Sequence, residues 1–312
     1  MLKENGTINV CVACDDNYAK YAGVVIASIL NNADPHDKLA IFILDGGISE
    51  EHKREITSLK SIRNFELNFI YINPILFSEY ANIKTHKYIT IATYYRLKLA
   101  SLIPNIDKII YFDCDMVINS SLSELFNTNM DGYLVAGVQD INKKMVKKNP
   151  TYVNAGMLIF NLAEIRKDGI EDKFLKWTKE HFAEIKTGDQ TIINEVCKEK
   201  IKLVNPIWNV QSSNFTNRSN YTNSPKVIHF VAKNKPWKKN CFSIHKNLYF
   251  KYLQLTPWKL TDEELSKALK SNAIEYIKYR PLFWLRPRFY EALLKTYIFK
   301  GEKMRWAILI FV

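Results

Sequence analysis

The chain has 312 residues, and 47% of them are hydrophobic, which is enough for a sizeable core and excludes a mainly disordered protein. Its net charge of +12 favours anionic partners, such as phosphates, nucleic acid or acidic lipid headgroups. No apolar run approaches the roughly 18 residues that cross a bilayer, and the N-terminus lacks the pattern of a secretory signal, so we expect a cytoplasmic protein that is soluble or peripheral to a membrane.

Short apolar runs alternate with helical patterns through the first half of the chain. Residues 8–13, 39–44, 67–72 and 108–112 are predicted strands, and residues 19–30 and 92–102 have the apolar spacing of helices. Ser49, followed by two glutamates, is a predicted helix N-cap. Because the strands are apolar on both faces and alternate with helices, we expect an α/β fold with a mostly parallel central sheet.

The second half continues with a predicted strand over residues 152–162, helices over 164–182 and 190–196, and a short strand over 226–230. Residues 205–225 are rich in Asn, Ser and Thr, which is typical of a loop. Cys11 and Cys14 have the spacing of a metal or redox pair. Residues three apart in a strand point to opposite faces, however, so we expect two separately buried cysteines.

Acidic residues follow two of the predicted strands. Asp15 and Asp16 come after the first strand, and Asp113 and Asp115 come after the fourth. Open α/β sheets bind ligands at the carboxyl ends of their strands, so these side chains are candidates for one site. Asp113 and Asp115 are two apart in an extended segment and can share a divalent cation, although such triplets also occur in solvated turns.

His229, at the end of the last predicted strand, is the histidine best placed to complete such a cation site. An imidazole ligand favours Mn²⁺ over Mg²⁺. A run of lysines that includes Lys235 follows. A histidine at a strand end also has a structural interpretation, and a lysine run also occurs as a solvated face. Together, a cation, an imidazole and an ammonium group would bind a nucleotide diphosphate.

Six motifs, in order and spread over residues 8–237, resemble those of the glycosyltransferases of family eight. They are Asp15-Asp16-Asn17-Tyr18 with Ala13 beside it, residues 92–99 with Arg96, Tyr111-Phe112-Asp113-Cys114-Asp115, Asn154-Ala155-Gly156, Gly188-Asp189-Gln190, and His229-Phe230 with Lys235-Pro236-Trp237. The resemblance implies a Rossmann-like nucleotide-diphospho-sugar transferase fold of the GT-A type.

The resemblance also implies a role for each motif. The metal is expected to be Mn²⁺, with Mg²⁺ as an alternative, bound by Asp113, Asp115 and His229. Asp189 and Gln190 are the expected catalytic residues beneath the donor sugar. The residues expected to contact the UDP-sugar are Ala13, Asp15, Asn17, Tyr18, Arg96, Asp113, Cys114, Asp115, Asn154, Ala155 and Lys235.

One position departs from the family pattern. The family usually has a glycine three residues after the metal-binding histidine, where its backbone lies close to the diphosphate, and this chain has Ala232. The added methyl group is tolerable if the backbone φ angle at this position is negative and costly if φ is positive. Contact between this backbone and the diphosphate therefore depends on the local conformation.

The implied reaction is the transfer of galactose or glucose from a UDP-sugar to a hydroxyl of a lipopolysaccharide-like or other cell-surface glycan, with retention at the anomeric carbon. A double displacement needs a carboxylate nucleophile beneath the sugar. Gln190 is a poor nucleophile, and Asp189 is better suited to bind sugar hydroxyls. We therefore prefer front-side attack, in which an oxygen of the departing phosphate takes the acceptor proton.

Two other classes of function remain open. One is another sugar-nucleotide enzyme, either a hydrolase or a nucleotidyltransferase, which would need a Gly-rich phosphate loop after the first strand; none is present there. The other is a non-enzymatic basic module that binds lipid or nucleic acid. That interpretation leaves Asp113, Asp115 and Asp189 unexplained, because carboxylates repel phosphates unless a metal intervenes.

We expect a catalytic domain over residues 1–260 and a helical basic-aromatic region over residues 261–312. From residue 276 to residue 312, ten aromatic residues interleave with eight Lys and Arg against two Glu. This composition suits an anionic membrane surface; the alternatives are a helical subdomain packed on the sheet and a nucleic-acid site, and we expect no nucleic acid. We therefore predict a peripheral protein at the inner face of the cytoplasmic membrane, with a glycan or lipid-linked oligosaccharide as acceptor.

Overall fold

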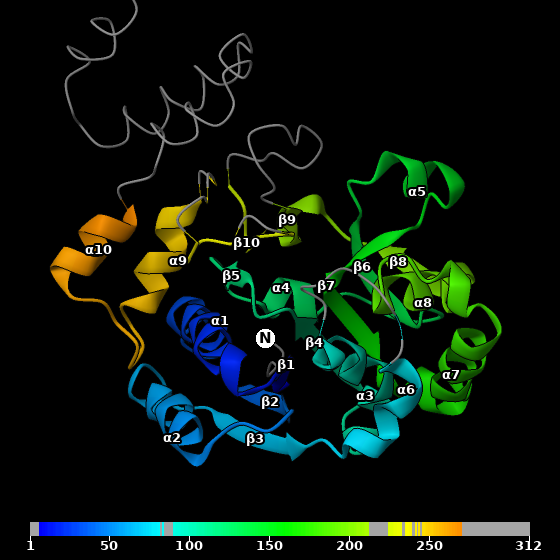
Figure 1. Cartoon of the computed structure of the whole chain (residues 1–312), viewed down its shortest axis with the longest axis horizontal. Coiled ribbons are helices and arrows are strands. Elements are labelled where there is room, and N and C mark those ends of the chain that lie inside the picture. The colour runs from blue at the N-terminus through cyan, green and yellow to red at the C-terminus, as the bar shows by residue number, and fades with distance from the viewer. Residues whose placement is uncertain are drawn as a thin grey trace, which may run out of the picture.

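The computed structural model describes residues 6–81, 83, 90–211, 224–232, 235–238, 241, 243 and 245–269. Within them the main sheet has seven strands in the order β3-β2-β1-β4-β7-β6-β8 (Figure 1). Of these described strands, only β7 runs antiparallel to its neighbours. The predicted α/β fold with a mostly parallel sheet is confirmed. The strands are β1 (Ile8–Cys14), β2 (Leu39–Asp45), β3 (Glu66–Tyr71), β4 (Lys108–Phe112), β6 (Val135–Gln139), β7 (Val153–Asn161) and β8 (Ile201–Leu203).

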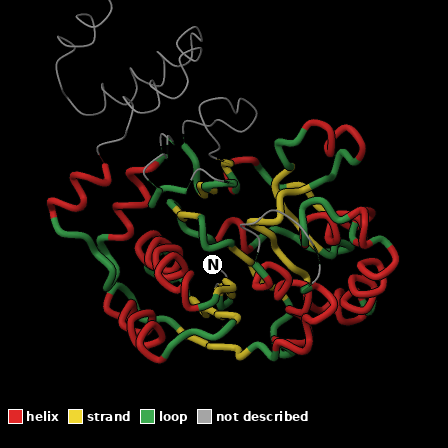
Figure 2. The backbone as a smooth tube through the Cα atoms, in the orientation of Figure 1, coloured by secondary structure: helices red, strands yellow, loops and turns green. Residues whose placement is uncertain are grey.

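Two groups of helices cover the two faces of this sheet (Figures 1 and 2). One group is α1 (Ala19–Asn32), α2 (Glu50–Ser58) and α4 (Ser123–Phe126). The other is α3 (Leu99–Leu102), α6 (Leu162–Lys167), α7 (Ile170–Glu180) and α8 (Asp189–Val196). Three helices lie outside these two layers: α5 (Lys143–Lys148), α9 (Lys246–Leu253) and α10 (Asp262–Leu269). The 3₁₀ helices are Asp16–Tyr18, Leu59–Ser61, Pro74–Tyr80, Ile91–Lys98, Phe182–Glu184, Lys198–Lys200 and Pro206–Trp208.

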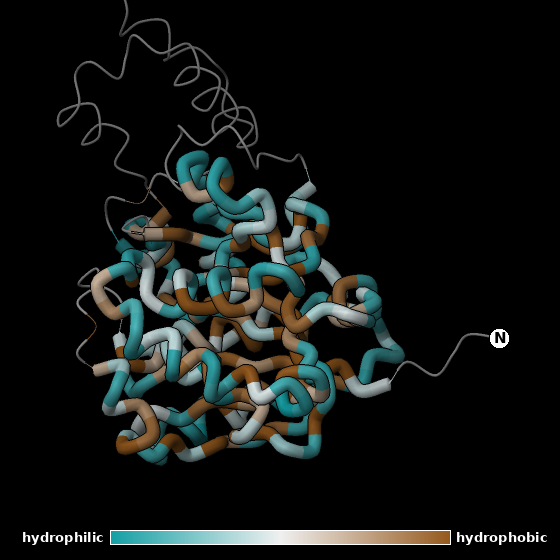
Figure 3. Tube along the Cα trace, turned by 90° about the vertical axis from the view of Figure 1, so that its right-hand side faces the viewer, coloured by the Kyte–Doolittle hydropathy of each residue, from teal (hydrophilic) through white to brown (hydrophobic). Residues whose placement is uncertain are grey.

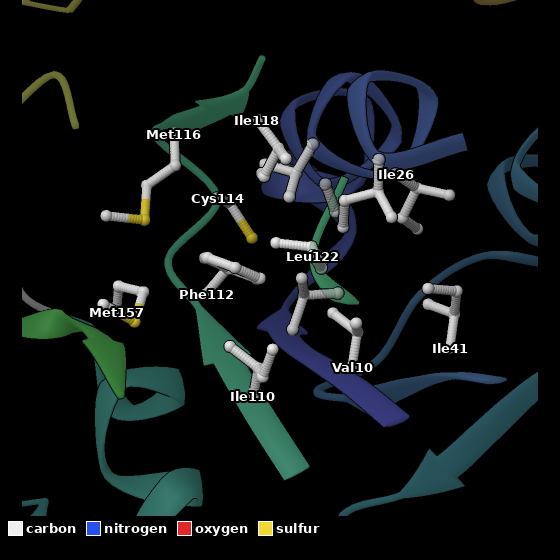
Figure 4. Packing of buried hydrophobic residues seen from close by; sticks show 14 of the residues in the cluster. Val10, Ile26, Ile41, Ile110, Phe112, Cys114, Met116, Ile118, Leu122 and Met157 are labelled. Carbon is white, nitrogen blue, oxygen red and sulfur yellow. The ribbon is translucent and has the colours of Figure 1, made fainter. Parts of the chain in front are cut away.

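The hydrophobic core lies on both faces of β1, as expected for a strand that is apolar throughout. Cys11 packs in the cluster on one face and Cys14 in the cluster on the other, so the two cysteines are buried separately, as predicted. Figure 4 shows Val10, Ile110 and Ile26 from β1, β4 and α1 meeting in one of these clusters. Each such buried side chain contributes about 1.5–3 kcal/mol through its removal from water.

A second, three-stranded sheet brings distant residues to the end of β4. It consists of β5 (Met116–Ile118), β10 (Val227–His229) and β9 (Val210–Gln211). β5 follows β4 after a three-residue connection and pairs antiparallel with β10, with His229 opposite Met116. A third cluster, which includes Val24 of α1 and Tyr249 of α9, fastens the small sheet to the rest of the fold.

Two predicted helices differ from the structure. Residues 92–102 form mainly the 3₁₀ helix Ile91–Lys98, followed by one turn of α3. The single helix predicted over residues 164–182 is divided into α6 and α7, because Gly169 between them has a left-handed backbone with φ 60°. β6 was not predicted; it contains Gly137, where an added Cβ would lie 2.7 Å from a carbon of Leu158. The close contact requires glycine, and glycine weakens the strand pattern.

The predicted basic-aromatic tail, residues 276–312, lies outside the described residues, as do residues 212–223 of the predicted loop. In the part of the chain that the structure describes, no helix is long and apolar enough to cross a membrane. The domain boundary near residue 260 stays a prediction. Beyond it, Leu265 and Leu269 of α10 pack against the cluster around α9.

Candidate active site

A pocket of about 450 Å³ opens at the carboxyl ends of β1, β4 and β6. This volume lies in the range typical of ligand sites. Cys14 and Asp15 at the end of β1, Asp113 after β4 and Asp140 after β6 all line the pocket. Because β7 runs in the opposite direction, its first residues, including Asn154, lie at this same edge of the sheet.

Asp113, Asp115 and His229 form a compact group of oxygen and nitrogen ligands in this pocket. Nε2 of His229 lies 3.1 Å from Oδ1 of Asp115 and 3.9 Å from Oδ2 of Asp113. One ligand atom from each of the three residues lies within 4.8 Å of the other two. Oδ1 of Asp115 is buried and accepts no hydrogen bond from any described residue.

The contacts of His229 determine which ring nitrogen carries the proton. Nδ1 lies 3.1 Å from Oδ1 of Asn154 and 3.2 Å from Oδ1 of Asn209, and both of these amide oxygens are acceptors. Nδ1 must therefore carry a proton, and in the neutral form of the ring the lone pair is on Nε2. This lone pair faces the carboxylate oxygen of Asp115, an arrangement that fits a divalent cation between them. Two carboxylates and one imidazole suit Mn²⁺.

Gly156 allows the imidazole to take this position. A Cβ atom added at residue 156 would lie 2.2 Å from Cε1 of His229 and 2.6 Å from its Nδ1. The backbone of Gly156 also accepts a hydrogen bond of 2.8 Å from the N–H of Asp113. The glycine therefore positions a metal-site carboxylate and the ring at the same time.

Two cationic side chains compensate the carboxylates. Arg96 is 3% exposed and donates from Nη2 to Oδ1 of Asp113 over 2.5 Å. Lys235 donates to Oδ2 of Asp115 and, over 2.8 Å, to the carbonyl of Phe230. Burial opposes ionisation of Asp115, but the ammonium group of Lys235 holds the pKa of this carboxyl well below its usual value. Asp115 is therefore ionised at neutral pH.

Asp189, at the start of α8, lines the same pocket. Its Oδ2 is 3.1 Å from Nε of Arg96, and the residue is 4% exposed. Burial raises the pKa of Asp189 to about 7, an effect that Arg96 opposes and the charge of Asp113 reinforces. This carboxyl group therefore titrates near neutral pH.

Gln190, the next residue, is held in one orientation. Its Oε1 accepts hydrogen bonds from the backbone N–H of Ala155 over 3.0 Å and from Nδ2 of Asn154 over 3.1 Å. Its Nε2 donates to Oδ2 of Asp140 over 3.2 Å. Asp140 also accepts from Nδ2 of Asn154 over 3.2 Å, so a chain of amide and carboxylate groups links the wall of α8 to His229.

The structure brings most of the sequence-predicted site residues into this one pocket. Asn17 is the exception: it is exposed in the turn Asp16–Tyr18 and does not line the pocket. The predicted residues that line it are Ala13, Asp15, Tyr18, Arg96, Asp113, Cys114, Asp115, Asn154, Ala155, Asp189, Gln190, His229 and Lys235.

Several lining residues were not predicted, among them Thr93, Asp140, Asn142, Thr187 and Gln211. Asp140 follows β6 in the same way that Asp15 and Asp113 follow their strands. It would have been found if β6 had been recognised as a strand.

The site position that departs from the family pattern also lines the pocket. Ala232 is exposed and has φ 56°, which lies in the left-handed region that favours glycine. The added methyl group is therefore costly at this position.

Comparison with known proteins agrees with the architecture of this pocket. Residues 9–241 match the sequence profile described as Glycosyl transferase family 8. A putative glycosyltransferase of Haemophilus influenzae is 30% identical over 298 residues, which cover 85% of this chain and 89% of the relative. A lipopolysaccharide 1,2-glucosyltransferase of Escherichia coli is 25% identical over 294 residues, which cover 87% of this chain and 84% of the relative. The crystal structure of the galactosyltransferase LgtC in complex with donor and acceptor sugar analogs superposes with a TM-score of 0.72 and 25% identity, over 83% of this chain and 100% of that one.

Proposed function

The chain belongs to glycosyl transferase family 8, and we propose that it transfers galactose or glucose from a UDP-sugar, with retention, to a hydroxyl of a lipopolysaccharide-like or other cell-surface glycan. One observation carries the proposal: a single pocket holds the cation ligands Asp113, Asp115 and His229 together with Asp189 and Gln190. A donor in this pocket would place its diphosphate at the cation and its sugar against α8.

The residues around the cation site suit a departing diphosphate. Asp113, Asp115 and His229 would hold Mn²⁺, or alternatively Mg²⁺, and the bound cation would stabilise the negative charge that grows on the leaving group. Lys235 adds an ammonium group beside the same ligands. Two of its three N–H groups donate to Asp115 and to the carbonyl of Phe230, which leaves the third for a phosphate oxygen.

The contacts of Asp189, Gln190 and Asp140 support front-side attack as the route to retention. Gln190 has its oxygen held by two donors, and Asp189 lies against Arg96. Asp140 accepts hydrogen bonds from two amide groups. The carboxylates of Asp140 and Asp189 are thus already engaged with other side chains, and neither is a free nucleophile. We therefore favour front-side attack, in which the acceptor proton is transferred to a phosphate oxygen of the donor. Mass spectrometry of the protein incubated with donor alone tests this: a glycosyl adduct on Asp140, Asp189 or Gln190 would overturn it.

Titration calorimetry with UDP, with and without MnCl₂, tests the donor and the metal. We expect UDP to bind and Mn²⁺ to strengthen its binding; a protein that does not bind UDP contradicts the proposed function. Release of UDP from a panel of UDP-sugars should then depend on an added oligosaccharide. Release without any acceptor would indicate a hydrolase instead. NMR of the anomeric proton of the product completes the assay, because a β-linked product from an α-linked donor excludes retention.

The membrane role belongs to residues 276–312 and rests on their basic and aromatic composition. We propose that they hold the enzyme at the inner face of the cytoplasmic membrane, near a lipid-linked acceptor. Flotation with anionic vesicles should recover the full chain but not a chain that ends at residue 272. Equal recovery of both would contradict this role.

A further inference from the structure

Helix α5 carries four lysines on one side. Lys143, Lys144, Lys147 and Lys148 occupy positions i, i+1, i+4 and i+5, which form one stripe on an α-helix. All four are exposed, whereas Met145 and the valine after it, on the other side of the helix, are half-buried. In Figure 1, α5 projects from the body of the protein beyond the ends of β6 and β7.

This arrangement does not stabilise the helix. Lys143 and Lys147, like the other pair of lysines four apart, are like charges that repel each other. Lys143 and Lys144 lie in the first turn, where the helix dipole disfavours cations, and Lys147 and Lys148 lie in the last turn, where it favours them, so the dipole does not account for the stripe. None of the four lysines forms an ion pair with any described residue.

Four lysines on other helices form ion pairs within their own helix or its first turn. Lys53 on α2, Lys167 on α6, Lys176 on α7 and Lys267 on α10 each lie within 4 Å of a glutamate three or four residues away. What distinguishes α5 is that four lysines without an ion pair to a described residue share one side of a single helix. Figure 3 shows that hydrophilic and hydrophobic segments alternate along the chain trace.

The stripe begins directly after residues that line the pocket. Asp140, Ile141 and Asn142, which directly precede α5, line the pocket. The side chain of Asn142 accepts a hydrogen bond of 3.2 Å from the N–H of Lys144, and Asp140 is bonded to Gln190. The beginning of the helix is thus joined to the wall that faces the donor sugar.

The order of the strands shows which substrate approaches α5. The sequence β1-β4-β7-β6 places the end of β1, with Asp15 and Tyr18, at one side of the pocket and α5 at the other, with the cation ligands after β4 between them. A nucleotide on β1 with its diphosphate at β4 leaves the α5 side for the second substrate. Because α5 directly follows residues 140–142, its four lysines lie on the acceptor side of the pocket.

We propose that α5 binds an anionic group of the acceptor, so that the acceptor is an acidic glycan carrying phosphate or carboxylate near the hydroxyl that is modified. This inference rests on the proposed function, which defines the acceptor. Exposed ammonium groups are mobile point charges and bind either kind of anion. Their attraction also raises the rate at which an acidic glycan reaches the pocket, and added salt screens it.

Binding of bacterial core oligosaccharide to the UDP- and Mn²⁺-loaded protein tests the proposal. The probe is used in its natural phosphorylated form, after dephosphorylation with aqueous hydrogen fluoride, and after reduction of its carboxyl groups; the two treated forms separate phosphate from carboxylate. We expect the wild type to bind the natural form at least tenfold more tightly than the form that has lost the recognised anion. The ratio should fall with increasing salt.

Two fourfold variants complete the test. Replacement of Lys143, Lys144, Lys147 and Lys148 by glutamine should bring the ratio of affinities close to one. The charge-matched control replaces four other lysines by glutamine: Lys60, Lys173, Lys176 and Lys259, which are exposed and do not line the pocket. This control should retain the wild-type ratio of affinities.

Three results would overturn the inference. The first is equal affinity of the wild type for all forms of the probe, and the second is no binding of any form by protein that has bound UDP. The third is an α5 variant that loses binding to phosphatidylglycerol vesicles but keeps the wild-type ratio of affinities for the natural and treated probes. The last would identify a membrane as the occupant. A wild-type protein that fails to bind UDP would instead contradict the proposed function, so the two failures are distinguishable.

Discussion

Ala232 shows at the scale of one residue how the site tolerates a local conflict. Its φ of 56° places an L-residue in the left-handed region, which costs about 1–2 kcal/mol. The neighbouring residues 227–231 are held by β10 and by a hydrogen bond from the N–H of Val231 to the carbonyl of His229. The backbone therefore keeps this turn although the side chain opposes it.

Replacement of Ala232 by glycine should raise the free energy of unfolding by about 0.5–1 kcal/mol, because relief of the left-handed strain exceeds the entropy that glycine adds to the unfolded chain. Urea denaturation measures the change. The matched control is Ala183→Gly in the 3₁₀ helix Phe182–Glu184, which should lower stability by about 0.5–1 kcal/mol. A decrease for both variants would contradict the strain at residue 232.

Asn209 acts on the metal site through another residue. It is fully buried, its Oδ1 faces Nδ1 of His229, and its Nδ2 donates to Oδ1 of Asn154 over 2.9 Å. It is therefore a positioning residue: it favours the tautomer in which Nε2 is available to a cation. Partners of this kind change metal affinity by about 10–100-fold.

We expect Asn209→Leu to weaken Mn²⁺ binding by about 10–100-fold, because one acceptor for the proton on Nδ1 is lost. Electron paramagnetic resonance of free Mn²⁺ measures the affinity directly. Asn209→Asp keeps an acceptor and should lose less Mn²⁺ affinity. Asn205→Ala removes only the N-cap of the 3₁₀ helix Pro206–Trp208, which Asn209 follows, and should leave Mn²⁺ affinity unchanged. If Asn209→Leu folds normally and binds Mn²⁺ as the wild type does, Asn209 does not position the imidazole.

At the scale of elements, α1 is held against the C-terminal part of the described chain by close contacts. Tyr21 of α1 stacks on Trp237 with ring centroids 3.9 Å apart, so the segment that carries Lys235 rests on this helix. Two residues further along α1, a Cβ added at Gly23 would lie 2.2 Å from the ring of Trp258. Glycine in the middle of α1 is explained by this ring.

The effect of Gly23→Ala on the free energy of unfolding should have opposite signs in the wild type and in a Trp258→Ala background. In the wild type the methyl group meets the Trp258 ring, and overpacking of this kind costs about 1–3 kcal/mol. In a Trp258→Ala background the obstacle is gone, and alanine should stabilise the helix by about 0.5–1 kcal/mol. Thermal or urea denaturation of the four proteins of this cycle gives the two values. The same sign in both backgrounds would contradict the packing of Trp258 on α1.

At the scale of the whole molecule, Asp189 makes stability depend on pH. Its pKa rises on folding from an ordinary 3.8 to about 7, first because of burial and then because of the charge of Asp113, with Arg96 opposing. Below pH 4 the carboxyl is neutral in both the folded and the unfolded state. Between pH 4 and 7 it ionises more readily in the unfolded state, so its contribution to stability falls as pH rises, and above pH 7 the penalty is constant.

Asp189→Asn removes this titration. The stability of the variant relative to the wild type should therefore increase from pH 4 to pH 7, by a few kcal/mol at most, and then level off. Urea denaturation at intervals between pH 4.5 and pH 8, in the presence of a chelator, measures the difference. A difference that stays constant across this range would show that Asp189 has the same pKa in both states.

Much of the fold could be predicted because its elements depend on local pattern. The strands of residues 8–14, 39–45 and 108–112 are mostly apolar, and Ser49 caps α2 as its position before two acids indicated. β6 and the division between α6 and α7 could not be predicted in this way. Both depend on a glycine whose role, close packing at Gly137 and a left-handed turn at Gly169, appears only in three dimensions.

The sequence by itself determined the α/β class, the carboxylates that follow β1 and β4, and the motifs that indicate the family, because each lies within a short segment. Only the tertiary structure decided how these segments meet. The pairing of β5 with β10 brings His229 beside Asp115, and the reversed direction of β7 brings Asn154 to the same edge. It also decided that Ala232 is strained, that Asn209 faces the imidazole, and that the residues directly before α5 line the pocket. The physical reason is that a contact between distant residues depends on strand register and chain direction, which no single segment contains.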